Sequence, residues 1–184
     1  MTKRELIDIL DMNPIIAAVR DDGWEKAIAS SAEVIFYLKA NLLTVEKRIA
    51  EAIEKGKTVF VHIDLADGIG KDKTGIEFLS KCGVHGIIST RNQLINIAKD
   101  KGLMTVQRFF ALDSQGLDSI RDIASSADLI EIMPGVVPKI IQRFSLDGAA
   151  VIAGGLIETK DEVMTALTAG ATAVSTGKNE LWNL

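Results

Sequence analysis

The chain has 184 residues, 25 of them acidic and 21 basic, so its formal net charge is −4. This length suits one domain with a substantial core, and 47% hydrophobic against 25% charged residues excludes intrinsic disorder. No apolar run reaches the roughly 18 residues that a membrane-spanning helix needs, and the N-terminus lacks the unbroken apolar stretch of a secretion signal. The lone Cys82 excludes an internal disulfide and a cysteine-based metal cluster. We therefore expect a cytoplasmic protein with no membrane partner.

The first predicted elements are a helix over Met1–Asp11 and a series of eight short strands. The strands are predicted by apolar, β-branched runs over Pro14–Val19, Val34–Leu38, Thr58–Asp64, Gly86–Thr90, Met104–Phe110, Leu129–Pro134, Ala149–Gly155 and Thr172–Thr176. Most of these runs are apolar at both side-chain parities, which is typical of strands covered on both faces.

Helical patterns lie between the strands. The clearest are Val45–Lys55, Asn92–Lys101 and Asp161–Ala169. Thr159 and Glu162 have the spacing of a capping box at the start of the last of these helices. Gly56, Gly102 and Gly170 stand where the three helices should end.

The strand runs start about every 22 residues, which is the length of one short βα unit. Such units favour parallel pairing through right-handed crossovers. We predict a compact (β/α)8 TIM-type barrel with shortened helices, formed by residues 1–184 as one domain. Because such barrels usually have at least about 200 residues, the helices after the first two strands must be short and the eighth nearly absent. The helix over Met1–Asp11 could then cover the barrel floor. An open doubly wound sheet is the alternative.

Polar residues gather at the carboxyl ends of the predicted strands, where barrels and open α/β sheets bind ligands. These ends carry Arg20-Asp21-Asp22, Lys39, His62-Ile63-Asp64, Ser89-Thr90-Arg91, Gln107-Arg108, Glu131, Gly154-Gly155 and Ser175-Thr176-Gly177. A barrel with a purely structural role has no physical reason to become polar at the end of every strand. The pattern therefore predicts a binding site at this end.

The last two strand ends predict a phosphate site. Its candidate residues are Gly154, Gly155, Ser175, Thr176 and Gly177. In phosphate-binding barrels the loops after strands seven and eight bind the anion, because glycine lets main-chain N–H groups approach its oxygens and hydroxyls add donors. Ordinary turn glycines are the alternative interpretation.

His62, Asp64 and Glu131 form a second group of candidates, since His62 and Asp64 are two residues apart and would share a strand face. The carboxylates could accept hydrogen bonds from ligand hydroxyls, act as acid and base, or hold a divalent metal with His62. They could also form a buried polar cluster with Arg108 and Arg20 through ion pairs. A second histidine ligand is missing from any matching strand end, so we expect neither a metal nor a cofactor.

Basic residues are expected on one rim of this acidic protein, where they would attract anions. They are Arg20, Lys39, Arg91, Arg108 and Lys178. Arg108 differs from the others because it lies within an apolar strand, where an unpaired guanidinium is costly. It needs an acidic partner or a ligand phosphate.

Seven segments, spread in order over almost the whole chain, carry a resemblance to a known family. They are Pro14–Asp21, Val61–Leu65, Gly86–Arg91, Gln107–Phe109, Glu131–Gly135, Ile152–Ile157 and Ala173–Thr176, with Leu181-Trp182 following the last. As a set they resemble the glycerol-3-phosphate-responsive antiterminators, which are regulatory proteins of glycerol-uptake operons.

The resemblance implies a small (β/α)8-type barrel that binds glycerol-3-phosphate as its effector and is not an enzyme. The bound form would act on an mRNA leader and prevent premature transcription termination. By position, Gly154, Gly155, Ser175 and Thr176 would bind the phosphate. The candidates for the glycerol end of the ligand, or for balancing its charge, are His62, Asp64, Arg108, Glu131, Arg20 and Arg91. The sequence departs from the family at Gly177, where a further Ser or Thr is expected, and in the short link Ser145–Gly148.

The RNA partner is implied by the resemblance alone, since the chain has no arginine-rich tract or aromatic platform for RNA. The basic rim is one contact surface that RNA could use. The alternative function is a phosphosugar isomerase or epimerase that uses Asp64 and Glu131 as acid and base. A barrel whose site has lost its function is a third hypothesis. Assembly into a homo-oligomer stays open.

Overall fold

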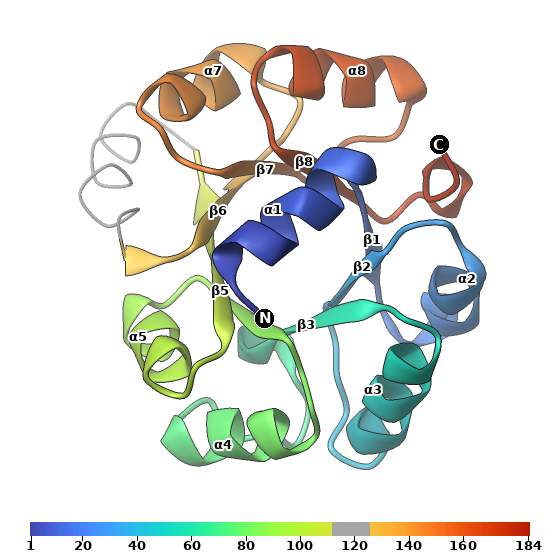
Figure 1. The fold of residues 1–184 in the computed structure, drawn as a ribbon, viewed down its shortest axis with the longest axis vertical. Helices are drawn as coiled ribbons and strands as arrows, with labels where there is room; N and C mark the ends of the chain where they lie inside the picture. Colours follow the sequence, from blue (N-terminus) through green and yellow to red (C-terminus); the bar gives the residue numbers. More distant parts are fainter. Residues whose placement is uncertain (112–125) are drawn as a thin grey trace.

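Eight parallel strands close into a barrel, in chain order, in the computed structural model, which describes residues 1–111 and 126–184 (Figure 1). The strands are β1 (Ile15–Val19), β2 (Val34–Tyr37), β3 (Thr58–His62), β4 (Gly86–Ser89), β5 (Met104–Phe110), β6 (Leu129–Met133), β7 (Val151–Gly154) and β8 (Ala173–Thr176). The barrel closes where β1 pairs with β8, with Ile15 opposite Val174. The (β/α)8 prediction is therefore confirmed, and the open sheet is excluded.

The described helices surround the strands, except α1, which crosses one end of the barrel (Figure 1). They are α1 (Lys3–Met12), α2 (Trp24–Ala29), α3 (Val45–Glu54), α4 (Lys73–Lys81), α5 (Asn92–Asp100), α7 (Pro138–Leu146) and α8 (Lys160–Thr168), with 3-10 turns η1 (Asp21–Gly23), η2 (Ile63–Leu65) and η4 (Asn179–Leu181). As predicted, α2 is short, and only η4 follows β8. The helix after β2 is not shortened, because α3 has ten residues and buries Val45, Ile49 and Ala52. Within the described ranges, no helix has the length and apolar character that crossing a membrane requires.

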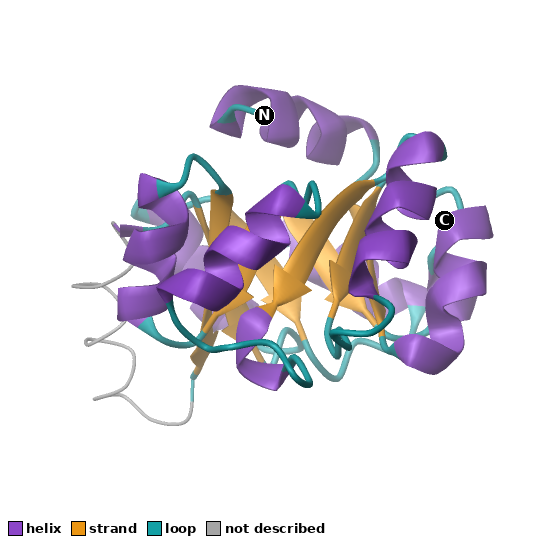
Figure 2. Cartoon of the chain, turned by 90° about the horizontal axis from the view of Figure 1, so that it is seen from below, coloured by secondary structure: helices purple, strands orange, loops and turns teal. Residues whose placement is uncertain are grey.

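The core has two layers because side chains alternate along each strand. One layer lies between the strands and the outer helices. The other fills the barrel and includes Ile16, Phe36 and Phe60, which pack with Leu6 and Leu10 of α1. Helix α1 lies across the amino-terminal end of the barrel, opposite the strand tips (Figure 2). The predicted floor helix is therefore confirmed, and it covers the end of the barrel opposite the strand tips.

Helix boundaries follow the local signals in the sequence. The Thr159 side chain accepts a hydrogen bond from the Glu162 N–H, and the Glu162 carboxylate accepts one from the Thr159 N–H. Gly56, Gly102 and Gly170 have φ angles of 73°, 74° and 99°, which glycine adopts without steric cost. The capping box and the three terminating glycines are thus confirmed.

Candidate functional site

A cavity of about 130 Å³ lies at the carboxyl end of the barrel. Its lining comes from β1, β5, β6, β8 and the residues that follow β2, β7 and β8: Ala18, Leu38, Arg108, Glu131, Met133, Gly155, Leu156, Ile157, Ser175, Thr176 and Gly177. Most of the predicted phosphate residues are therefore beside the Arg108 and Glu131 pair in one cavity.

A buried ion pair forms the floor of this cavity. Arg108 and Glu131 are opposite each other in the β5–β6 register, and both side chains face the barrel interior. Oε2 of Glu131 accepts a 2.6 Å hydrogen bond from Nε of Arg108, and Oε1 accepts a 2.6 Å hydrogen bond from Oγ of Ser175. Glu131 is fully buried and Arg108 is 7% exposed. Glu131 is therefore the acidic partner that the sequence predicted for Arg108.

The guanidinium of Arg108 keeps donors available for a ligand. Its Nε is bound to Glu131, but no residue in the described ranges accepts a hydrogen bond from Nη1 or Nη2. Arg108 lines the cavity, so these terminal N–H groups lie at its surface. Charge-assisted donors in a largely buried site bind an anion more strongly than surface donors do.

The turn after β7 contributes main-chain donors. Gly155 has a φ of +75°, and Leu156, which is not a glycine, has a φ of +62°. Within the described part of the chain, the N–H groups of Gly155, Leu156, Ile157 and Gly177 have no hydrogen-bond acceptor. All four residues line the cavity. Successive free N–H groups in a turn of this kind form an anion-binding surface.

Gly154 has a steric role. It lies in β7 beside Glu131, and a Cβ atom there would overlap Oε1 of Glu131 and come within 2.9 Å of Oγ of Ser175. Its carbonyl also accepts a 2.6 Å hydrogen bond from the N–H of Gly135. Gly154 therefore makes space for the ion pair, and it is not among the residues that line the cavity.

Ser175 and Thr176 have different roles because neighbouring residues on a strand point to opposite faces. Ser175 points inward to Glu131. The Thr176 hydroxyl donates to the carbonyl of Ile157 and accepts from the N–H of Lys178. Thr176 thus ties the turns after β7 and β8 together, and its hydroxyl is already committed within the protein.

Asp64 lies apart from Glu131, contrary to the expectation of a shared strand face with His62. Strand β3 ends at His62, and Asp64 falls in the 3-10 turn η2, which rotates its side chain toward the end of β4. It accepts hydrogen bonds from the Thr90 N–H at 2.7 Å, from Arg91 Nε at 2.9 Å and from the Ser89 hydroxyl. Burial alone would raise the pKa of the Asp64 carboxyl, but these donors outweigh it and hold the pKa below its ordinary value. Asp64 and Arg91 therefore neutralise each other outside the cavity.

His62 lies inside the barrel and is 2% exposed. Its Nδ1 is the one buried side-chain nitrogen or oxygen in the described ranges that lacks a hydrogen-bond partner. Burial lowers the pKa of His62 to about 4, and the positive charge of Arg108 contributes to this decrease. The negative charges of Asp64 and Glu131 act in the opposite direction. The imidazole is therefore neutral at pH 7.

The basic rim is only partly available for anions. Lys39 pairs with Asp67 at 3.5 Å, and Lys178 pairs with Glu158 at 3.3 Å, in each case between exposed side chains. Arg20 is exposed and lines a neighbouring hollow of about 400 Å³, which shares Ala18, Leu38 and Gly177 with the cavity. Arg20 is therefore beside the cavity and does not pair with Glu131.

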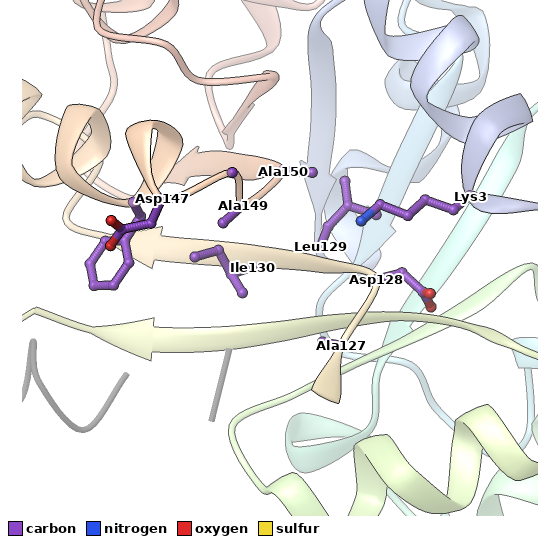
Figure 3. A pocket seen from close by; sticks show the side chains of 10 residues that line it. Lys3, Ala127, Asp128, Leu129, Ile130, Asp147, Ala149 and Ala150 are labelled. Carbon is purple, nitrogen blue, oxygen red and sulfur yellow. The ribbon is translucent and has the colours of Figure 1, made fainter. Parts of the chain in front are cut away.

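A further hollow, of about 280 Å³, lies at the opposite end of the barrel between β6 and α7 (Figure 3). Its charged side chains are Lys3, Asp128 and Asp147. Two carboxylates against one ammonium group do not suit an anion, and Asp128 already accepts hydrogen bonds from the N–H and hydroxyl of Thr105. Across residues 1–111 and 126–184, no three His, Cys, Asp or Glu side chains form a group that could hold a metal ion.

Leu156 and Ile157 are cavity residues that the sequence did not indicate. They offer main-chain N–H groups, for which side-chain chemistry gives no signal. The position of Ile157, two residues after the Gly154-Gly155 pair, is the only hint in the sequence.

The chain is similar to a known family over nearly its whole length. A family model described as "Glycerol-3-phosphate responsive antiterminator" matches residues 15–182. A protein of Escherichia coli K12, named "Uncharacterized protein YgcP", is 33% identical over an aligned length of 184 residues, and the alignment covers 97% of this chain and 96% of that protein.

Two solved structures of glycerol uptake operon antiterminator proteins are also similar to this chain, in both sequence and fold. A glycerol uptake operon antiterminator regulatory protein from Listeria monocytogenes is 32% identical with a TM-score of 0.86, over 92% of this chain and 95% of that one. A glycerol uptake operon antiterminator-related protein from Thermotoga maritima is 35% identical with a TM-score of 0.82, over 91% and 96% of the chains. A deoxyribose phosphate aldolase from Aeropyrum pernix shares only the fold, at 14% identity and a TM-score of 0.70.

Proposed function

The chain belongs to the glycerol-3-phosphate responsive antiterminator family, and from this premise we propose that it binds glycerol-3-phosphate in the cavity at the carboxyl end of its barrel. In the bound state it acts on an mRNA leader and prevents premature transcription termination. The names of the Listeria and Thermotoga relatives, which place those proteins in glycerol uptake operons, support the regulatory role.

The observation that carries the ligand proposal is the combination of donors around the cavity. The terminal nitrogens of Arg108 and the N–H groups of Gly155, Leu156, Ile157 and Gly177 have no acceptor in the described part of the chain. A phosphate dianion supplies several acceptor oxygens and the negative charge that such a group of donors favours. Glu131 fixes Arg108 through Nε and leaves the other guanidinium nitrogens for the ligand.

Two observations count against the enzyme alternative. Asp64 accepts hydrogen bonds from Ser89, Thr90 and Arg91, and Glu131 is held by Arg108 and Ser175, so neither carboxylate is placed to move a proton of a ligand. The eight barrel strands carry no lysine that could form a Schiff base. Both observations support a site that binds without turnover.

Thermal unfolding with glycerol-3-phosphate, glycerol and inorganic phosphate tests the ligand. The ester should stabilise the fold by about 2.7 kcal/mol at a hundredfold excess over its dissociation constant, and glycerol should have no effect. Arg108→Met should abolish the shift. Arg91→Met is the matched control, because Arg91 pairs with Asp64 outside the cavity, and it should retain the shift. An equal shift with phosphate alone, or none with the ester, would contradict the proposal.

The RNA step needs a separate test. RNA crosslinked to the chain in cells grown with and without glycerol should be enriched in one leader transcript when glycerol is present. In vitro transcription through that leader should read past its terminator only with the chain and glycerol-3-phosphate together, and binding should weaken steeply with salt. Read-through that is unaffected by the ester would exclude this regulatory role. Ester-dependent exchange of substrate protons for solvent deuterium would favour an enzyme.

A further inference from the structure

The position of His62 destabilises the fold unless a ligand supplies a hydrogen-bond partner for Nδ1 of its imidazole. A buried polar atom without a partner destabilises the fold, and Nδ1 of His62 is in that state in the described chain. Its neighbours in the sheet are apolar: it is opposite Ile88 of β4, and Phe60, two residues earlier, faces the same interior layer. A leucine or phenylalanine would fill this position at no such cost.

His62 is the neighbour of a cavity residue, although it is not itself among the residues that line the cavity. In the β2–β3 register Tyr37 is opposite Val61, so the next residues along the two strands, Leu38 and His62, are neighbours that face inward. Leu38 lines the cavity from the end of β2, which is three strands away from both β5 and β7 around the closed barrel. A molecule whose phosphate contacts Arg108 and whose carbon chain extends toward Leu38 therefore approaches the His62 ring.

The other polar candidates for the carbon chain are already engaged. Asp64 and Arg91 pair with each other, and both oxygens of Glu131 accept hydrogen bonds from protein donors. Arg20 lies in the neighbouring hollow. Of the side chains proposed from the sequence for the glycerol end, two are buried and keep hydrogen-bonding groups without a partner in the described chain: Arg108, whose terminal nitrogens would bind the phosphate, and His62, which is left for the carbon chain.

We propose that His62 hydrogen-bonds a hydroxyl group on the carbon chain of the ligand, so that the site selects hydroxylated three-carbon phosphate monoesters over esters without a hydroxyl. This inference rests on the proposed function, because it assumes that a phosphate ester occupies the cavity. A neutral imidazole suits the role, since it can accept a hydrogen bond at one ring nitrogen and donate one at the other. It also adds no charge to a site in which Arg108 is fixed by Glu131.

Calorimetric titration of wild type, His62→Leu and His62→Gln with sn-glycerol-3-phosphate, propyl phosphate and inorganic phosphate tests the inference. Wild type should bind glycerol-3-phosphate about tenfold more tightly than propyl phosphate, since one buried hydrogen bond separates the two ligands. His62→Leu should bind the two esters equally, and its affinity for propyl phosphate should be no lower than that of wild type. His62→Gln should recover part of the preference, because its amide can also bond a hydroxyl.

A measurement on the unaltered protein covers the case in which a variant does not fold. The ¹⁵N resonance of the His62 Nδ1 should move on addition of glycerol-3-phosphate and should move much less with propyl phosphate. Equal affinities of wild type for the two esters, a preference that survives in His62→Leu, or an unmoved resonance at saturating glycerol-3-phosphate would overturn the role of His62 and leave the proposed function intact. If neither ester binds to wild type, the proposed function fails.

Discussion

Gly154 of β7 lies against the carboxylate of Glu131 in β6, and a Cβ atom at Gly154 would overlap Oε1 of Glu131. The glycine therefore permits the hydrogen bonds that Glu131 accepts from Arg108 and Ser175. A glycine pair that looks like a phosphate-binding turn in the sequence thus has two tasks. Gly154 accommodates the ion pair, and Gly155 begins the turn that lines the cavity.

Gly154→Ala should destabilise the protein by roughly 1–3 kcal/mol, because the added methyl group forces Glu131 out of a tightly packed position. Chemical denaturation measures the loss. Gly177→Ala is the matched control: the nearest atom to an added Cβ is the carbonyl oxygen of Ala18 at 3.7 Å, so its stability should not change. Equal stability of Gly154→Ala and wild type would contradict the steric role.

Glu131→Gln should cost about 3–5 kcal/mol of folding free energy, because it leaves the Arg108 guanidinium buried without its counter-charge. The double variant Arg108→Met, Glu131→Leu should recover most of this loss and should not bind glycerol-3-phosphate. Glu77→Gln, which disrupts more exposed pairs with Lys81 and Lys101, is the control and should cost less than about 1 kcal/mol. A double variant as unstable as Glu131→Gln would argue against the ion-pair explanation.

Leu156→Asn should stabilise the protein by about 0.5–1 kcal/mol. Leu156 has a φ of +62° and is 69% exposed, so asparagine relieves a left-handed conformation that leucine disfavours and removes little burial. Thermal unfolding measures the gain. Leu146→Asn, at the end of α7 with 80% exposure, is the control and should give no gain. A destabilised Leu156→Asn variant would indicate that the leucine side chain makes a contact of its own.

The fold should lose stability as the pH falls from about 6.5 toward 4. The pKa of His62 is near 6.5 in an unfolded chain and about 4 in the folded one, so only the unfolded state takes up the proton in this range. The full change in folding free energy corresponds to roughly 3 kcal/mol, and above pH 6.5 this group has no effect on stability.

Denaturation curves across the range from pH 6.5 to pH 4 should show this loss of stability as a slope in wild type. The slope should largely disappear in His62→Leu and persist in His85→Gln, whose own pKa is also lowered by burial. A slope unchanged in His62→Leu would contradict the assignment.

Much of the site could be predicted because it follows from strand order and residue chemistry. A guanidinium within the apolar run of β5 requires an acidic partner, and Glu131 on the next strand meets that need. The prediction that Asp64 shares a strand face with His62 was wrong, because the strand was expected to continue to Asp64. The chain turns into η2 after His62, and a turn changes the face to which every later side chain points.

The sequence by itself determined a fold of parallel strands joined by helices, since repeated strand and helix patterns of nearly constant length favour right-handed crossovers. The tertiary structure decided that these strands close into a barrel and do not form an open sheet. The sequence also determined that the last two turns lie at the carboxyl end of the strands. Only the tertiary structure decided which of Ser175 and Thr176 faces inward, which main-chain N–H groups remain without an acceptor, and that Nδ1 of His62 lacks a partner. Hydrogen bonds between residues from different strands depend on register and on distances below about 3 Å, and a pattern along one chain does not contain that information.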